Sequence, residues 1–192
     1  MTRYSKQWLR TEELEKMFSY SDLSEKYEIW MYLLYTPALR VSEAINVKVR
    51  DLDAKHECIE IWGGKGHDET ELQKAHCDAR VLKRIERYCE HCNLRPNDYI
   101  MFSQKSKQVD RSQVYRVLND ICHAVNIDKK IGTHTMRRSR AEHLLDSGLP
   151  LTYVSKYLRH KNLSTTMKYL DISLSDIQRE LSKIDDTITL IV

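Results

Sequence analysis

Residues 132–137 of the 192-residue chain read Gly-Thr-His-Thr-Met-Arg. Thr133 is a residue type that favours the N-cap, so a helix is predicted over residues 133–147. His134 and Arg137 are three positions apart and share one face of that helix. The same face continues with apolar side chains, namely Ala141, Leu144 and Leu145. An arginine in this position needs an anionic partner, which is either a carboxylate of the fold or a phosphate ligand at the helix N-terminus.

A second arginine lies in a similar setting earlier in the chain. Arg40 and Glu43 are three positions apart and flank Val41 and Ala44. A surface ion pair of this kind contributes at most about 1 kcal/mol. Alternatively, Glu43 orients Arg40 so that its guanidinium holds two phosphate oxygens. The sequence leaves both interpretations open.

Helical periodicity covers most of the chain. Residues 11–14 (TEEL) are typical of a helix start, and Thr36-Pro37 predicts the N-cap and first residue of another helix. The other predicted helices are 24–35, 78–92, 112–124, 133–147, 150–158, 164–170 and 173–184. Alternating side chains around a glycine-rich turn predict a β-hairpin over residues 57–73. We expect a mainly α fold with a small antiparallel β-sheet (α+β), as one domain over residues 1–186 with an apolar tail at 187–192.

The composition excludes several classes of protein. Apolar residues make up 41% of the chain, and 5 Gly and 3 Pro are too few for a collagenous or linker-like chain. No apolar run is long enough for a transmembrane helix, so no membrane partner is expected. The odd number of cysteines, 5, and the charged N-terminus without a signal-peptide pattern predict a cytoplasmic location.

The net charge of +3 is unevenly distributed. Residues 129–168 hold nine Lys or Arg and two acids, which gives +7 and leaves −4 for the rest of the chain. This basic block is typical of a polyanion-binding face, although solvated lysines would give the same pattern. The residues expected to contact DNA are Lys129, Lys130, Arg138, Arg140, Arg159 and Lys161.

Three further residues carry weak signals when taken singly. Lys65 lies between glycines at the tip of the predicted hairpin, where a lysine is usually solvated but can also deliver a proton into a DNA groove. His160 and Tyr169 are nine residues apart across a Ser-Thr-Thr stretch. An isolated tyrosine is far more often a packing residue than a nucleophile.

Taken in order, these segments resemble the motifs of the tyrosine recombinase (phage integrase) family. The matching segments are 39–43 (LRVSE), 63–66 (GGKG), 134–137 (HTMR), 158–160 (LRH) and 164–169 (STTMKY). The chain departs from the family at three places. Arg159 stands where the family usually has glycine, Arg138 where a second histidine is common, and Thr36-Pro37-Ala38 replaces the usual Thr-Gly.

The resemblance implies site-specific DNA recombination through a 3′-phosphotyrosyl intermediate, with no cofactor and no metal. The catalytic residues that it implies are Arg40, Lys65, His134, Arg137, His160 and Tyr169. Tyr169 would attack the scissile phosphate while two arginines hold its oxygens and two histidines add hydrogen bonds. Lys65 would protonate the leaving 5′-oxygen, and Glu43 would orient Arg40.

The resemblance also implies partners. These are double-stranded DNA and three further copies of the chain in a tetramer on DNA, which would place the protein at the nucleoid. The tail at 187–192 is a candidate for exchange with a neighbouring copy. The pattern begins near residue 8, which predicts that the usual N-terminal core-binding domain is absent. The chain is then either a short member of the family or an isolated catalytic domain, and an accessory DNA-binding protein is a candidate to replace the absent domain.

Three alternatives remain at this point. One is a DNA-binding regulator that has kept the fold without chemistry, and another is a type IB topoisomerase-like enzyme that relaxes DNA. The third is a zinc site, because Cys89 and Cys92 have C-x-x-C spacing, with His76 and Cys77 upstream. The cysteine pair falls inside a predicted helix and the second pair has the wrong form, which argues against zinc.

Overall fold

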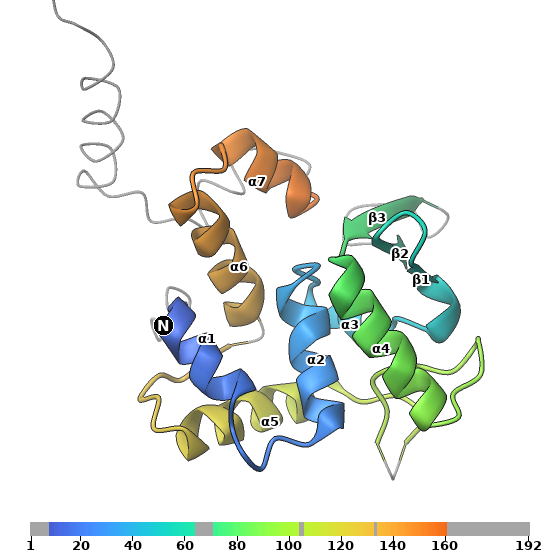
Figure 1. The fold of residues 1–192 in the computed structure, drawn as a ribbon, viewed down its shortest axis with the longest axis horizontal. Coiled ribbons are helices and arrows are strands. Elements are labelled where there is room, and N and C mark those ends of the chain that lie inside the picture. Colours follow the sequence, from blue (N-terminus) through green and yellow to red (C-terminus); the bar gives the residue numbers. More distant parts are fainter. Residues whose placement is uncertain (1–7, 64–70, 104–105, 133, 161–192) are drawn as a thin grey trace, which may run out of the picture.

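The computed structural model describes residues 8–63, 71–103, 106–132 and 134–160 (Figure 1). The elements in chain order are α1 (Thr11–Phe18), α2 (Glu25–Tyr35), α3 (Val41–Ala44), η1 (Val49–Asp51), β1 (Leu52–Asp53), β2 (Cys58–Trp62), β3 (Leu72–His76), α4 (Ala79–His91), α5 (Arg111–Ala124), α6 (Thr135–Asp146) and α7 (Leu151–Tyr157). This mainly helical fold with a small antiparallel sheet confirms the expected fold class. The predicted helices 164–170 and 173–184 and the tail at 187–192 lie outside the described residues.

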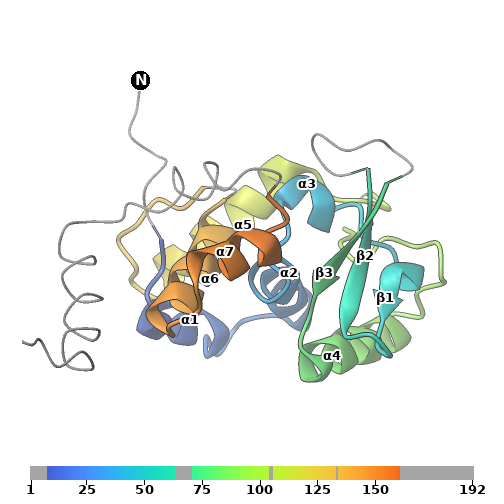
Figure 2. The same cartoon turned by 90° about the horizontal axis from the view of Figure 1, so that it is seen from above.

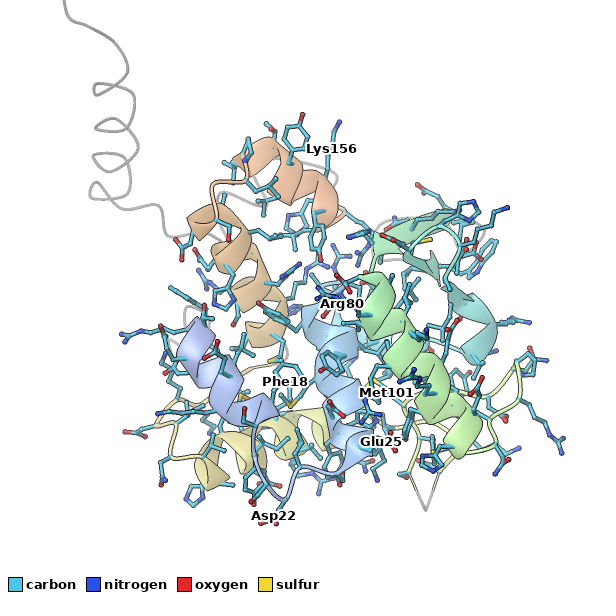
Figure 3. The ribbon with its side chains drawn as sticks, viewed as in Figure 1. Phe18, Asp22, Glu25, Arg80, Met101 and Lys156 are labelled. Carbon is cyan, nitrogen blue, oxygen red and sulfur yellow. The ribbon has the colours of Figure 1, made fainter. Side chains whose placement is uncertain are left out.

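Helix α2 lies at the centre of the fold and contacts α3, α4, α5 and α6 (Figures 1 and 2). Its buried residues are Ile29, Trp30, Met31, Leu33 and Leu34. A helix with apolar side chains on nearly every face must be covered on several sides. Polar side chains such as Asp22, Arg80 and Lys156 lie on the outer surface, whereas Met101 is buried (Figure 3).

The sheet has the strand order β1-β2-β3, and both pairs are antiparallel. The β2–β3 pair confirms the predicted hairpin and extends it to His76, with Ile59 opposite Ala75. Ile59 and Ile61 are buried as their alternation predicts, whereas Trp62 is 55% exposed. Leu72 faces Trp62 across the pair and is 38% exposed.

Helices α6 and α7 form a helical hairpin with a small core of its own. Ala38, Ala141, Val154 and Leu158 are all buried in this second cluster. Gly148 has a φ angle of +86° and reverses the chain between the two helices. The end of α7 therefore lies against the segment that contains Ala38.

The predicted helix start at Thr36-Pro37 is wrong. Helix α2 ends at Tyr35, and Ala38 takes a left-handed backbone with a φ angle of 48°. The next helix, α3, begins at Val41 with Arg40 as its N-cap. The backbone N–H of Arg40 donates to the Glu43 carboxylate and caps the helix. The N-cap residue is therefore four positions later in the sequence than predicted.

None of the five cysteines forms a disulfide. Cys58, Cys77, Cys89 and Cys122 are buried, and Cys92 is exposed. Burial raises the pKa of Cys77, Cys89 and Cys122 to about 12. Within the described ranges every helix is too short or too polar to cross a bilayer.

Candidate active site

Arg137 on α6 joins three segments that are distant in the sequence. Its side chain is 1% exposed. Its Nη1 donates to the carbonyl of Ala38 at 2.5 Å, and its Nη2 donates to the carbonyl of Leu158 at the end of α7. The sequence predicts an anionic partner for this arginine. In the structure two backbone carbonyls accept from its guanidinium, and a carboxylate oxygen of Glu43 lies 4.0 Å from Nη1.

Glu43 supplies the carboxylate at this junction, and its side chain is 4% exposed. Its Oε1 accepts a hydrogen bond from Arg40 Nη1 at 2.5 Å. Its Oε2 accepts from Arg159 Nη2 at 2.7 Å and lies 4.0 Å from Arg137 Nη1. Burial alone would raise the pKa of Glu43, but the charges of Arg159 and Arg40 outweigh that effect and lower it. The carboxylate is therefore ionised at neutral pH, and its pair with Arg40 is not a solvated surface pair.

The charges at this cluster are unequal. Arg40, Arg137 and Arg159 surround Glu43, so three guanidiniums share one carboxylate. Desolvated positive charge favours an incoming anion. A phosphate diester is an anion whose non-bridging oxygens match the guanidinium fork.

His160 follows this cluster directly at the end of α7. Its backbone N–H donates to the carbonyl of Ser155 at 3.1 Å, which fixes its place in the turn. Burial, and then the charges of Arg137, Arg40 and Arg159, lower the pKa of His160 to about 4. The imidazole is therefore neutral at pH 7 and offers one donor and one acceptor.

Of the remaining predicted catalytic residues, the structure describes only His134. His134 is the N-cap of α6 and is exposed, so it lies at the surface end of the helix that buries Arg137. Lys65 and Tyr169 lie outside the described residues. The structure thus brings together Arg40, Glu43, Arg137 and His160 of the predicted set.

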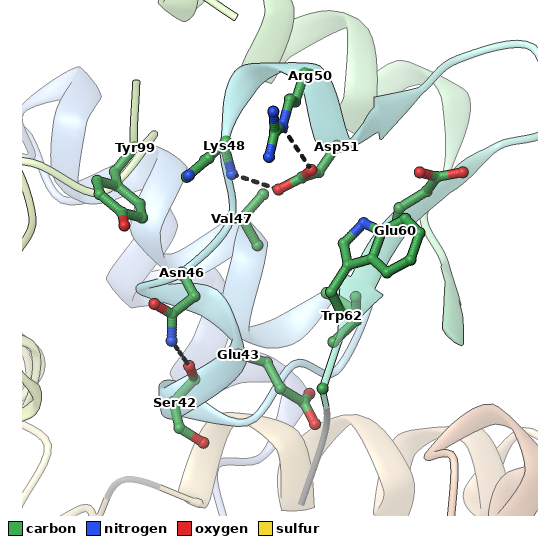
Figure 4. Close-up of a pocket in the computed structure, with 12 residues that line it drawn as sticks. Ser42, Glu43, Asn46, Val47, Lys48, Arg50, Asp51, Glu60, Trp62 and Tyr99 are labelled. Atoms are coloured by element: carbon green, nitrogen blue, oxygen red, sulfur yellow. Dashed lines mark hydrogen bonds and ion pairs between the residues drawn. The ribbon is translucent and has the colours of Figure 1, made fainter. Parts of the chain in front are cut away.

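A pocket of about 390 Å³ lies beside this cluster, between α3 and β2 (Figure 4). Its lining includes Ser42, Glu43, Lys48, Trp62, Gly63 and Tyr99. Gly63 is the last described residue before the hairpin turn that contains Lys65. The pocket therefore connects the arginine cluster with the base of that turn.

Several residues of the basic block are engaged within the fold. Lys129 Nζ is 2.6 Å from Glu13 Oε2 and also donates to the carbonyl of Trp8. The side chain of Arg138 is 6% exposed and lies 3.7 Å from Glu142. These contacts leave less open positive surface than the sequence indicates, and DNA contact by these residues remains a prediction.

Arg140 and Arg159, two further residues of the block, are also held by internal contacts. Arg140 lies over the rings of Tyr35 and Tyr157, at 5.3 and 5.7 Å from their centroids. The side chain of Arg159 is 7% exposed. Lys130 is exposed, and Lys161 lies outside the described residues.

Sequence reasoning missed Tyr157 and assigned Arg159 no place beside Glu43. The hydroxyl of Tyr157 donates to the carbonyl of Thr36 and accepts from Arg140 Nε. Tyr157 and Arg159 thus hold the end of α7 against the segment before α3. The signals for Arg159 in the sequence are its position directly before His160 and the fact that it stands where the family usually has glycine. For the zinc alternative, the described residues contain no group of three or more His, Cys, Asp or Glu that could hold a metal ion.

Comparison with solved structures defines the class of fold. The crystal structure of XerA recombinase matches with a TM-score of 0.80 and 20% identity, over 96% of this chain and 67% of that one. XerH recombinase bound to its difH substrate matches with a TM-score of 0.72 and 21% identity, over 95% and 56% of the two chains. The fold is thus that of a tyrosine recombinase catalytic domain.

Comparison of sequences gives the family. The model of the phage integrase family matches residues 7–175, and the chain belongs to this family. It is 32% identical over 165 residues to a tyrosine recombinase of Pseudothermotoga lettingae, and 30% identical over 187 residues to tyrosine recombinase XerC of Staphylococcus aureus. These matches cover 86% and 92% of this chain but 56% and 60% of the two relatives.

Proposed function

We propose that the chain is the catalytic domain of a site-specific recombinase that cleaves and rejoins DNA through a 3′-phosphotyrosyl intermediate. The observation that carries this proposal is the buried cluster of Arg40, Arg137 and Glu43 beside His160. A regulator that only bound DNA would gain nothing from gathering three arginines around one buried carboxylate next to a neutral histidine, because taking an excess of positive charge out of water is costly.

The reaction that we propose exchanges one phosphodiester for another. The Tyr169 oxygen bonds to phosphorus and loses its proton, and the bond from phosphorus to the 5′-oxygen breaks. Lys65 supplies the proton to that 5′-oxygen. Arg40 and Arg137 hold the two non-bridging oxygens and stabilise the extra negative charge of the transition state. The ester to tyrosine conserves the bond energy, so rejoining requires no external energy source.

The two histidines have separate tasks in this mechanism. His160 is neutral at pH 7 because of its lowered pKa, so it acts as a hydrogen-bond donor to a phosphate oxygen rather than as a cation. His134 lies at the exposed start of α6 and assists transfer of the tyrosine proton. Both assignments are supported by position in the chain and by the motif that the residues resemble.

We further propose that double-stranded DNA is the substrate and that four copies assemble on it, with the tail at 187–192 exchanged between copies. The basic block would neutralise phosphates of the DNA backbone, and it includes Lys129, Lys130, Arg138, Arg140 and Lys161. An accessory DNA-binding protein is a further candidate partner. Action on DNA would place the protein at the nucleoid.

Covalent trapping tests the proposal. The full chain is incubated with nicked duplexes taken from the DNA that flanks its own gene and from random libraries, and the products are run on a denaturing gel. We expect a shifted band that Tyr169→Phe abolishes. Tyr153→Phe is the matched control, because Tyr153 is a tyrosine on α7 that is 63% exposed, and it should leave the band unchanged.

Two outcomes would overturn the proposal. DNA binding that weakens with salt, without any adduct on any duplex, would identify a DNA-binding regulator. Adduct formation with relaxation of supercoiled DNA by a monomer would identify a topoisomerase-like enzyme. Sedimentation of the protein–DNA complex distinguishes a monomer from a tetramer.

A further inference from the structure

Four helices of this chain end in the same backbone motif. In α4, α5, α6 and α7 the chain closes with two hydrogen bonds around one residue in the left-handed conformation. The left-handed residues are Asn93, Asn126, Gly148 and Arg159. Asparagine and glycine tolerate this conformation, whereas an arginine is strained there. The backbone therefore gives no reason for arginine at the end of α7.

The side chain of Arg159 gives that reason. It is 7% exposed, so it is not displayed to solvent. Its Nη2 donates to Glu43 Oε2 at 2.7 Å, and its Nη1 donates to the carbonyl of Pro37 at 3.2 Å. These contacts join the end of α7 to the segment before α3. An arginine that only contacted solvent, or that attracted DNA through its charge alone, would not need to be buried.

The oxygen that Arg159 holds is also the one nearest Arg137. Glu43 Oε1 accepts from Arg40 Nη1 at 2.5 Å. Oε2 accepts from Arg159 Nη2 at 2.7 Å and from the backbone N–H of Arg40 at 2.8 Å, and Arg137 Nη1 lies 4.0 Å from it. A carboxylate oxygen that already accepts a short charge-assisted bond attracts a second guanidinium less strongly. Arg159 thus competes with Arg137 for Glu43.

We propose that Arg159 is a positioning residue that holds Glu43 and so keeps the Arg137 guanidinium from closing onto it. The Arg137 guanidinium, which the carbonyls of Ala38 and Leu158 hold in place, then keeps the position from which it contacts the scissile phosphate. This inference rests on the proposed function, because it assigns Arg137 a phosphate as ligand. It accounts for the strained backbone of Arg159 and for the shorter distance from Glu43 Oε2 to Arg159 than to Arg137.

A double-mutant cycle with Arg159→Gly and Glu43→Gln tests the proposal. Glycine suits the left-handed position, so the variant should fold, and its melting temperature checks this. We expect single-turnover cleavage of a nicked duplex to fall at least tenfold, with the Kd for DNA changed less than threefold. In the Glu43→Gln background, Arg159→Gly should change the rate less than twofold, because the competition is already removed.

Two more variants complete the set. Asn126→Gly is the matched control, because it makes the same backbone change at the end of α5, and it should cleave at the wild-type rate. Arg159→Lys keeps the charge without the fork, so its rate should lie between those of wild type and Arg159→Gly, and it replaces the glycine variant in the cycle should that variant unfold. Wild-type cleavage by Arg159→Gly, or an equal loss in both Glu43 backgrounds, would overturn the proposal.

A crystal structure of the Arg159→Gly variant separates this inference from the proposed function. We expect the Arg137 Nη1 to Glu43 Oε2 distance to shorten from 4.0 Å to a direct hydrogen bond. A distance that stays at 4.0 Å or grows would contradict the inference even where wild type cleaves DNA. Failure of wild type to form any adduct would instead contradict the proposed function, and this distance would still decide the role of Arg159 toward Glu43.

Discussion

Glu57 is an exposed residue in the turn between β1 and β2, and its φ angle is 50°. A left-handed backbone costs an L-residue about 1–2 kcal/mol, and glycine avoids that cost. We expect Glu57→Gly to raise the free energy of unfolding by about 1 kcal/mol and the melting temperature by about 2–4 °C. Thermal denaturation followed by circular dichroism measures this.

Lys55 provides the control for that substitution. It is exposed in the same turn, and its φ angle is not positive. Lys55→Gly should lower the melting temperature, because glycine adds conformational freedom to the unfolded chain without relieving strain. Equal shifts for the two variants would contradict the argument from the backbone angle.

The histidine beside the arginine cluster makes stability depend on pH. Burial and the neighbouring arginines lower the pKa of His160 from its ordinary 6.5 to about 4, so the unfolded chain binds this proton more readily. The free energy of unfolding should therefore fall as the pH decreases from 6.5 towards 4. We expect His160→Gln to make this fall less steep in urea titrations.

His123 is the control for the pH experiment, because it is an exposed histidine on α5. His123→Gln should leave the slope of the wild-type curve unchanged. The His160 variant should keep part of the slope, since burial also lowers the pKa of His143. Identical slopes for wild type and His160→Gln would contradict the lowered pKa of His160.

At the residue scale, the sequence indicates which charges need partners but not which partners they find. The spacing of Arg40 and Glu43 is sufficient to predict their pairing. The two carbonyls that hold Arg137 lie 99 and 21 positions away, and the arginine that shares Glu43 lies 116 positions away. Contacts of that range depend on how the helices pack, which local periodicity does not contain.

At the element scale, the segment that leads into α1 is joined to α6 through one buried hydroxyl. Ser139 Oγ accepts from the backbone N–H of Leu9 at 2.8 Å and donates to the carbonyl of Thr135 at 2.8 Å, with none of the residue exposed. Ser139→Ala leaves the Leu9 N–H buried without this partner. We expect the free energy of unfolding to fall by about 2 kcal/mol and the melting temperature to fall by about 4–8 °C.

The C-cap residue of the same helix provides a matched control for this prediction. Ser147 Oγ makes the same kind of bond, to the carbonyl of His143 four residues earlier at 2.7 Å, but it is exposed. Water can bond to the His143 carbonyl in its place, so Ser147→Ala should lower the free energy of unfolding by less than about 0.5 kcal/mol. Comparable losses for the two serines would show that the contact with Leu9 contributes little.

The elements themselves were largely predictable. Helices α2, α4 and α5 begin and end within one residue of the predicted bounds, because each has a long apolar stripe. The error at Thr36-Pro37 has a physical cause, since the left-handed Ala38 and the Glu43 carboxylate at Arg40 set the start of α3. Strand β1 has only two residues and forms by pairing with β2, so no local pattern predicts it.

At the scale of the whole molecule, the proposed assembly depends on the C-terminal tail. The last six residues read TITLIV, and such an apolar terminus is stabilised by burial against a partner surface. We expect deletion of residues 187–192 to leave the affinity of one copy for DNA unchanged and to reduce the size of the complex on DNA. Sedimentation velocity measures both, and an unchanged complex would contradict tail exchange.

The exposed Cys92 makes it possible to count chains directly in such a complex. The other four cysteines are buried, so a maleimide fluorophore should attach to the native protein at one thiol per chain and to the unfolded protein at five. No substitution is required to prepare this sample. The number of photobleaching steps on a single immobilised duplex then gives the number of copies bound there.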